Sequence, residues 1–191
     1  MIDWIETIDQ KIVLFINGFH TPFLDEFMWL VSGKLIWIPL YLIILYFSYK
    51  QYGLKKTFVF LLVAVLSIVF SDVLSSQVVK KLIARYRPSH HLELSEKLHF
   101  YMKNSGEVYK GGQYGFVSSH AANFFALTVL SANYLRRSYK YFPYFLFFFS
   151  VLVSLSRIYL GVHYLTDILG GAIIGSCFGY LGWRFMKSRI V

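Results

Sequence analysis

The sequence predicts an all-α integral membrane protein, a bundle of about five transmembrane helices with an N-terminal interfacial amphipathic helix. Two observations predict this class. Hydrophobic residues make up 57% of the 191 residues and charged residues only 15%, against about 25% charge in soluble domains. Five long stretches are also nearly free of charge. Because a chain of this length fits one domain, we expect residues 1–191 to form a single membrane domain.

The predicted elements follow one another as apolar stretches separated by polar loops. In residues 1–34, apolar positions such as Trp4 and Val13 mix with charged ones, which favours an interfacial amphipathic helix over a sixth crossing. The start, MIDWIETIDQK, has no basic region before an apolar run, so it does not indicate a cleaved secretory signal. Some apolar cores fall short of the ~20 residues of a full span, so flanking polar residues must complete them. The predicted spans cover residues 35–49, 57–79, 121–135, 141–156 and 168–183.

The last predicted span carries a stripe of small residues. Gly171, Gly175 and Gly179 recur every four residues and therefore share one helix face. Such a stripe lets the backbone of another helix approach closely. We therefore predict tight packing of this helix against a neighbour.

Basic residues orient the bundle, because short loops rich in Lys and Arg tend to stay in the cytoplasm. Three such groups fall on one side of the predicted topology: Lys50, Lys55 and Lys56; Arg136, Arg137 and Lys140; and Arg184, Lys187 and Arg189. The outer side then receives the N-terminal segment, the turn at 157–163 and a long extracytoplasmic loop at 86–117. Many basic residues also lie on that outer side, and the positive-inside rule does not explain why they are there.

Composition excludes several other classes of protein. The net charge of +9 suits an anionic ligand or an anionic lipid surface, but no basic run outside the spans provides a face for nucleic acid. Cys177 is the only cysteine, which excludes an intramolecular disulfide and a multi-cysteine metal centre. The loop histidines His90, His91 and His99 are interpreted as solvated and are given no role. The sequence makes no prediction about oligomeric state.

Polar side chains gather at the outer ends of the predicted spans. Ionisable groups at membrane depth are costly and by default mark function or a paired interaction. Because the topology brings these groups to one face, we predict a single site. Asp72, about two helical turns deeper than Lys80, is interpreted as a packed, hydrogen-bonded residue. The clustered residues are Lys80, Arg85, Arg87, Ser118, Ser119, His120, Ser156, Arg157, His163 and Asp167.

The residue types in this cluster suit a phosphate. Lys80 and Arg87 are seven residues apart, so on a continuous helix ended by Pro88 they would face the same way. Arginine forks match phosphate oxygens in bidentate fashion; the alternative for Lys80 is snorkelling to the interface. Ser118 can cap the next helix while N–H groups at the helix start meet an anion. A plain N-cap is the alternative for Ser118.

His163 and Asp167 are four residues apart and share one helix face. The carboxylate can therefore accept the Nδ1 proton and leave Nε2 free to attack phosphorus. A phosphohistidine would form, and a second histidine, for which His120 is available, must protonate the departing oxygen and later activate water. A metal pair is the rival interpretation, but no Asp or Glu near the other helix ends would complete a coordination shell. We therefore predict no metal and no cofactor.

Taken together, this pattern resembles the type 2 phosphatidic acid phosphatase (PAP2) superfamily of integral membrane lipid phosphatases. The family motif K-x6-R-P appears as KKLIARYRP at residues 80–88, and S-R-x5-H-x3-D stands complete as SRIYLGVHYLTD at 156–167. P-S-G-H corresponds to VSSH at 117–120, where Ser119 replaces a glycine that lets the backbone approach the phosphate. Residues 1–34 carry no motif.

The resemblance implies a metal-independent, two-step phosphoryl transfer. His163 would be the nucleophile, Asp167 its orienting partner, and His120 the general acid and then base. The remaining motif residues would hold the phosphate: Lys80, Arg87, Arg157, Ser118 and Ser119. The VSSH variant is similar to that of bacterial phosphatases acting on lipid A or undecaprenyl diphosphate.

These features lead to an expected substrate class and location. We expect a phosphorylated membrane lipid, with lipid A phosphate favoured, then undecaprenyl diphosphate, then phosphatidylglycerol phosphate. The active site would face the periplasm from a bacterial inner membrane. One alternative is a non-catalytic lipid-phosphate binder or transporter, which would have no need of the histidine pair. Another is an intramembrane serine hydrolase built on Ser118 or Ser119, which would have no need of three convergent cations.

Overall fold

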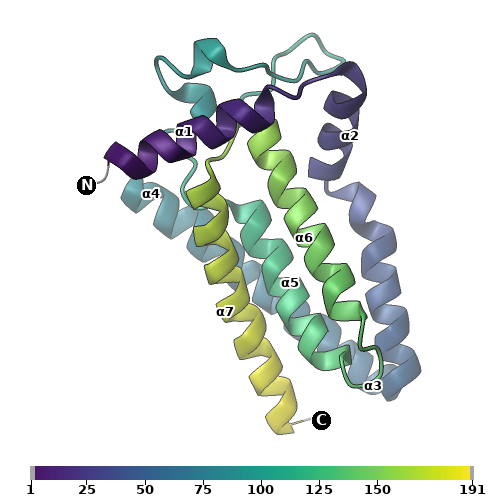
Figure 1. The fold of residues 1–191 in the computed structure, drawn as a ribbon. Coiled ribbons are helices and arrows are strands. Elements are labelled where there is room, and N and C mark those ends of the chain that lie inside the picture. Colours follow the sequence, from purple (N-terminus) through teal and green to yellow (C-terminus); the bar gives the residue numbers. More distant parts are fainter. Residues whose placement is uncertain (1–2, 190–191) are drawn as a thin grey trace.

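The computed structural model describes residues 3–189, with side chains from 4 to 188, and this part of the chain is helical with no strand (Figure 1). The predicted all-α class is confirmed. Short 3-10 turns occur at Leu35–Trp37, Pro88–His90 and Ser95–Lys97. The helices are α1 (Asp3–Asn17), α2 (Pro22–Ser32), α3 (Ile38–Asp72), the π-helical η2 (Val73–Val79), α4 (Lys80–Ile83), α5 (Ser119–Leu135), α6 (Phe142–Tyr159) and α7 (Leu165–Arg189).

Two of the predicted spans, 35–49 and 57–79, lie on the two arms of α3 and extend into the short segments on either side of it, because α3 reverses at Gly53. The φ angle of 75° at this residue is non-helical, and glycine adopts such an angle without the steric cost of a side chain. The second arm then runs back toward the other end of the bundle, passing behind α5 and α7 to α4 (Figure 1). Ser48 and Thr57, one on each arm, join the two arms through a 2.9 Å hydrogen bond between hydroxyl oxygens.

Three helical stretches of the described residues are long and apolar enough to cross a membrane: Leu35–Ile83, Phe142–Tyr159 and Leu165–Ser188. The first holds the two arms of α3. Helix α5, of 17 residues, lies between α6 and α7 (Figure 1). Large apolar side chains on the outward faces, such as Leu42, Phe58 and Leu181, are exposed, as expected where lipid rather than water surrounds the bundle.

The glycine stripe of α7 packs directly against α5, as predicted. A Cβ atom added at Gly175 or Gly179 would overlap the carbonyl oxygen of Ala122 or Ala126 on α5. Both alanines are themselves small, and Ala126 is fully buried. The close approach matters for the site, because α5 and α7 each begin at the end of the bundle where the predicted site residues lie.

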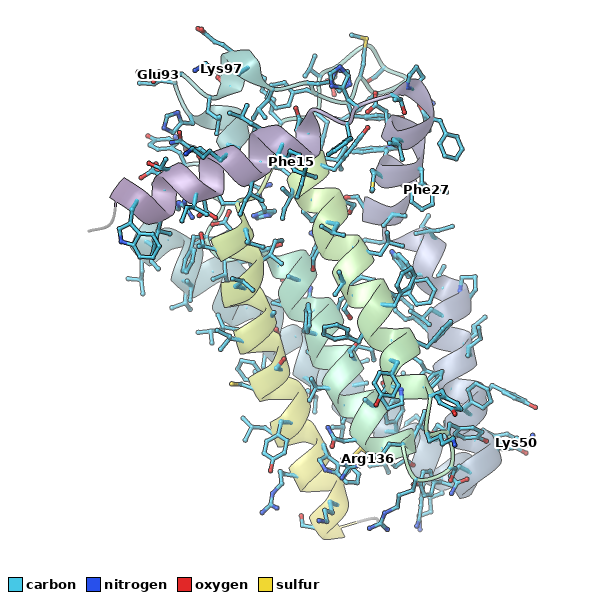
Figure 2. All side chains as sticks on the ribbon, in the orientation of Figure 1. Phe15, Phe27, Lys50, Glu93, Lys97 and Arg136 are labelled. Atoms are coloured by element: carbon cyan, nitrogen blue, oxygen red, sulfur yellow. The ribbon has the colours of Figure 1, made fainter. Side chains whose placement is uncertain are left out.

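The two ends of the bundle differ in charge and structure. Lys50 and Arg136 lie at the end where α3 reverses and α5 ends, whereas Glu93 and Lys97 lie at the opposite end (Figure 2). The three basic groups are thus on one side, as the topology predicts, although the side chain of Arg189 lies outside the described residues. That this side is cytoplasmic stays a prediction.

The N-terminal segment forms two helices, so the prediction of a single amphipathic helix over residues 1–34 was wrong in extent. The chain turns after Asn17, and Thr21 starts α2 by accepting a hydrogen bond from Leu24 N–H, with Pro22 at the first helical position. Helix α1 lies across the end of the bundle (Figure 1). At 15 and 11 residues, each helix is shorter than the ~20 residues of a span.

The loop at 86–117 is folded onto these two helices. Leu94 and Leu98 are buried in one apolar cluster with Val13 of α1. His99 Nε2 lies 2.8 Å from an Asp25 oxygen of α2, and its ring stacks on His20. The interpretation of His99 as a loose, solvated histidine was wrong in part: its side chain is 36% exposed, but Asp25 of α2 and His20 before α2 hold its ring in place.

Candidate active site

The predicted site residues come together where the end of η2 and α4 meets the starts of α5 and α7 and the end of α6. His163 lies in the turn between α6 and α7 and is buried. Four other predicted residues lie within electrostatic range of its imidazole: Arg87, Arg157, Lys80 and His120. The structure therefore assembles in space residues that are up to 83 positions apart in the sequence.

His163 is paired with Asp167 as the spacing predicts, although His163 lies in the turn before α7 and not on the helix itself. Its Nδ1 lies 3.2 Å from Asp167 Oδ2, and the same oxygen accepts the Tyr164 N–H at 3.0 Å. Burial lowers the pKa of His163 well below its usual value, and the charges of Arg87 and Arg157 lower it further. The imidazole is thus neutral near pH 7, and with Nδ1 donating to the carboxylate the Nε2 lone pair is available.

The continuous helix predicted from Lys80 to Arg87 is wrong. Helix α4 ends at Ile83, and Ala84 adopts a left-handed φ of 48°. Residues 85–87 are extended, because their backbone groups pair with the loop: Gly115 N–H donates to the Arg85 carbonyl, and Arg87 N–H donates to the Gln113 carbonyl. Pro88 also disfavours a helical Arg87.

The extended segment still delivers Arg87 to the site. Arg85 and Arg87 are two residues apart and so point to the same side of an extended chain, and both side chains reach the site, while Tyr86 between them is exposed. Lys80 and Arg87 lie within electrostatic range of each other. The two cations therefore lie close together as predicted, but an extended segment and not a continuous helix connects them.

Two arginines supply most of the positive charge beside His163. Arg87 Nε donates to the Tyr114 carbonyl at 3.0 Å, and burial together with the charge of Arg157 lowers the pKa of Arg87. Arg157 Nη1 donates to Ser32 Oγ and Nη2 to Tyr109 Oη. Its Nε is a buried donor without a partner among the described residues. Mutually repelling buried cations of this kind suit a polyanionic ligand.

The two serines occupy the start of α5. Ser118 caps the helix, since its Oγ accepts from the Ala121 N–H, and its own N–H donates to the Asp167 carbonyl at 2.9 Å. The Ser119 hydroxyl lies 3.4 Å from Lys80 Nζ. The predicted N-cap is thus present, and it also fixes the start of α5 against the start of α7.

His120 connects the site to open space. Two cavities of about 420 Å³ and 360 Å³ share His120, Lys34 and Gly33 in their walls. Arg157 lines the smaller one. A ligand that enters through these cavities would meet His120 at the edge of the cationic cluster.

Sequence reasoning missed a bridge between α1 and the site. Arg85 donates to Asp167 Oδ1 at 3.2 Å and to Asp9 Oδ2 at 2.9 Å. Asp9 also accepts from Thr166, through the backbone N–H at 3.1 Å and through the hydroxyl. The guanidinium of Arg85 stacks on the ring of Tyr164. The position of Arg85 beside Arg87 was a signal, but no pattern in residues 1–34 identified Asp9.

The side chains of the described residues include no group of three or more His, Cys, Asp or Glu placed to hold a metal ion. The predicted histidine and aspartate of the H-x3-D motif bond instead to each other and to Arg85. The side chains that remain to bind a ligand are therefore mainly cationic hydrogen-bond donors, which suit a phosphate better than a metal ion.

Comparison with known protein families identifies the chain. The model of the PAP2 superfamily matches residues 57–190. This chain belongs to the PAP2 superfamily. The matched range contains every predicted site residue, and the resemblance drawn from the three motifs is confirmed. Helices α1 and α2 lie outside the range matched by the PAP2 model.

Two curated relatives are similar in sequence to this PAP2 chain over nearly its whole length. It is 36% identical over 185 residues to a lipid A 4'-phosphatase of Bacteroides thetaiotaomicron, a match that covers 97% of this chain and 78% of the relative. It is 32% identical over 191 residues to a lipid A 4'-phosphatase of Porphyromonas gingivalis, covering 98% of this chain and 78% of the relative.

Two solved structures share the fold. A transmembrane PAP2-type phosphatidylglycerolphosphate phosphatase from Bacillus subtilis superposes with a TM-score of 0.70 at 23% identity, covering 99% of this chain and 90% of that one. Aquifex aeolicus LpxE superposes with a TM-score of 0.64 at 22% identity, covering 93% and 95%. The PAP2 chain therefore has the fold of a multi-pass membrane protein.

Proposed function

We propose that this chain is a metal-independent membrane phosphatase that removes a phosphate group from a phosphorylated lipid. The observation that carries the proposal is the buried His163–Asp167 pair, with three cations and a second histidine in electrostatic range. Such a pair serves a nucleophile, whereas a binder or transporter would need only the cations. Residues 1–191 would act as one catalytic domain.

In the proposed reaction, Nε2 of His163 attacks phosphorus while His120 donates a proton to the leaving oxygen. An N–P bond forms as the P–O bond breaks, and the dephosphorylated lipid leaves with that proton. His120 then takes a proton from water, the hydroxide attacks the phosphohistidine, and inorganic phosphate departs. Throughout both steps the proton stays on Nδ1 of His163, and Asp167 accepts a hydrogen bond from it. The phosphate oxygens would be held by Lys80, Arg87, Arg157, Ser118 and Ser119.

For the substrate we favour lipid A phosphate, then undecaprenyl diphosphate, then phosphatidylglycerol phosphate. Both curated relatives, at 36% and 32% identity, are lipid A 4'-phosphatases, which supports lipid A phosphate as the first of the three. We further propose that the active site faces the periplasm from a bacterial inner membrane, because the basic residues that the positive-inside rule places in the cytoplasm lie at the opposite end.

The proposal is tested by inorganic phosphate release from candidate lipids in detergent, with EDTA present. We expect turnover that EDTA leaves unchanged, loss of at least about 10³-fold in His163→Ala, and near wild-type activity in the control His91→Ala, which alters a histidine of the outer loop. His120→Ala should lower phosphate release as strongly as His163→Ala, because His120 acts in both steps, and rapid quenching of the wild-type protein with radiolabelled substrate should trap an acid-labile phosphoenzyme. Turnover that requires an added divalent metal would contradict the mechanism.

Orientation is tested separately. A cysteine introduced at Ser105, in the loop at 86–117, should react with a membrane-impermeant reagent added outside intact spheroplasts. Labelling only after the membrane is opened would place the site on the cytoplasmic side.

A further inference from the structure

The larger of the two cavities beside His120 has walls that change in chemical character with depth. It is lined on α5 by Ser119, His120, Asn123, Phe124 and Leu127. With a rise of 1.5 Å per residue, Asn123 lies about 4.5 Å below His120 and Leu127 about 6 Å below Asn123. The α5 wall therefore runs from the catalytic histidine past one amide, with the ring of Phe124 beside it, to the apolar side chain of Leu127.

The facing wall, from the second arm of α3, shows the same order. Asp72 and Ile68 both line the cavity and, four residues apart, lie on one helix face. Asn123 Nδ2 donates to Asp72 Oδ1 at 3.0 Å, so the two polar residues sit at the same depth. The cavity thus has a phosphate end, a polar middle and an apolar end.

The apolar end continues into a second, purely apolar groove. Ile68, Leu127 and Tyr41 line both spaces. The groove, of about 170 Å³, lies between the arms of α3 and α5, and its remaining lining is apolar: Ile44, Leu45, Phe60, Leu61, Ala64 and Val65. A lipid whose phosphate lies at His120 would place its hydrocarbon there.

The polar middle has hydrogen-bond acceptors to spare. Asp72 accepts from Asn123 and, at 3.4 Å, from Ser76, whereas a carboxylate offers about four acceptor positions. Asn123 Oδ1 is buried and accepts from no group among the described residues. Because a carboxylate repels phosphate oxygens, this part of the cavity does not suit the phosphate. It suits a ligand group that donates hydrogen bonds.

We propose that Asp72 and Asn123 form a headgroup subsite that binds hydroxyl or amide N–H groups of a sugar next to the scissile phosphate. This inference rests on the proposed phosphatase function and names its substrate class, a phosphorylated glycolipid with acylated amino sugar. An isoprenyl diphosphate joins its phosphates directly to hydrocarbon and has no donor for this subsite. Asp72 and Asn123 act here in substrate selection, not in the chemical step.

A structural role for Asp72 makes a different prediction. Asp72 lies within electrostatic range of Lys80 and could serve only as its counter-ion. Loss of a counter-ion would disturb phosphate binding for every substrate equally. Loss of a sugar subsite affects only substrates that carry the sugar, so a comparison of two substrates separates the two roles.

The test uses the full-length protein in detergent and two substrates, lipid A phosphate and hexadecyl phosphate, a long-chain monoester without hydroxyl or amide groups. The variants are Asp72→Asn and Asn123→Ala. The control is Asn133→Ala, which alters the other asparagine of α5, bonded to the Val129 carbonyl far from the cavity. We expect both subsite variants to lower kcat/KM for lipid A phosphate about 10- to 100-fold, mainly through KM, and to change hexadecyl phosphate hydrolysis less than about threefold.

The wild-type protein gives a second measurement that does not depend on a variant folding. It should hydrolyse lipid A phosphate with a kcat/KM at least about tenfold above that for hexadecyl phosphate. Equal rates on the two substrates, or an equal loss on both in the variants, would overturn the sugar subsite and leave the phosphatase intact. Failure of the wild-type protein to release phosphate from any lipid would overturn the proposed function itself.

Discussion

Gly115 tests whether the position of Asp167 controls the reaction. A Cβ atom added at this residue would lie 2.8 Å from Asp167 Oδ2 and 3.2 Å from Arg87 Cγ. Ordinary contacts of a Cβ atom begin near 3.4 Å, so the carboxylate oxygen must move by about 0.6 Å. That same oxygen accepts hydrogen bonds from His163 Nδ1 and Tyr164 N–H.

The displacement sets the expected size of the effect. The His163–Asp167 hydrogen bond is already 3.2 Å long, and a shift of 0.6 Å would take it beyond hydrogen-bonding distance. Misplacement of about 1 Å in a catalytic group can cost about 10²-fold. We therefore expect Gly115→Ala to lower kcat for phosphate release about 10- to 100-fold. Overpacking should lower the free energy of unfolding by about 1 to 3 kcal/mol.

Gly112→Ala is the matched control, because it makes the same change three residues away, where an added Cβ meets nothing within 4 Å. Phosphate release and thermal unfolding are measured for both variants in the same detergent. A Gly115→Ala protein that folds and keeps kcat within about threefold of the control would refute the assignment of Asp167 as the positioning partner of the nucleophile.

Two further predictions concern the charges around His163. Asp9→Asn removes one carboxylate from Arg85 and should lower kcat about tenfold with KM within about twofold. Its control is Asp25→Asn, which removes the negative charge between His99 and Tyr159 and should leave kcat near the wild-type value. Equal kcat in the two variants would contradict a role for Asp9. Because burial and the charge of Arg87 lower the pKa of His163, its neutral form persists as the pH falls through 6.5. After correction for substrate ionisation, the acid limb of kcat/KM should lie below that pH and move upward in Arg87→Gln; a wild-type limb at or above pH 6.5 would refute this reasoning.

The sequence predicted where the helices lie and which polar residues come together better than it predicted the backbone geometry that brings those residues together. All five charge-free stretches lie in helical segments, two of them on the arms of α3 and in η2, since apolar faces must be shielded from water; that five helices cross the membrane stays a prediction. The H-x3-D spacing predicted the contact of His163 with Asp167, but not that His163 would lie in the turn before α7 rather than on the helix. The prediction of a helix over residues 80–87 was wrong beyond Ile83. The backbone groups of Arg85 and Arg87 form hydrogen bonds with residues 113–115, and local helix propensity carries no information about such long-range pairing.

The same limit explains why Asp9 escaped notice. An acidic residue in an amphipathic segment is expected to face water, and only the tertiary fold shows that Asp9 is buried against Arg85 and Thr166. Lys34 was missed for a similar reason. Its place beside His120 depends on how α2 joins α3, and that junction has no motif.

The charges of the assembled site explain why α1 belongs to it. Lys34, Lys80, Arg85, Arg87 and Arg157 carry five positive charges, and Asp72 and Asp167 would leave three of them unbalanced. Asp9 from α1 supplies a third carboxylate through Arg85, which leaves a net charge of +2. A phosphate monoester dianion balances that remainder, and buried charges are tolerated only when they are compensated. Helix α1, although outside the range matched by the superfamily model, thus contributes a carboxylate to the charge balance of the candidate site.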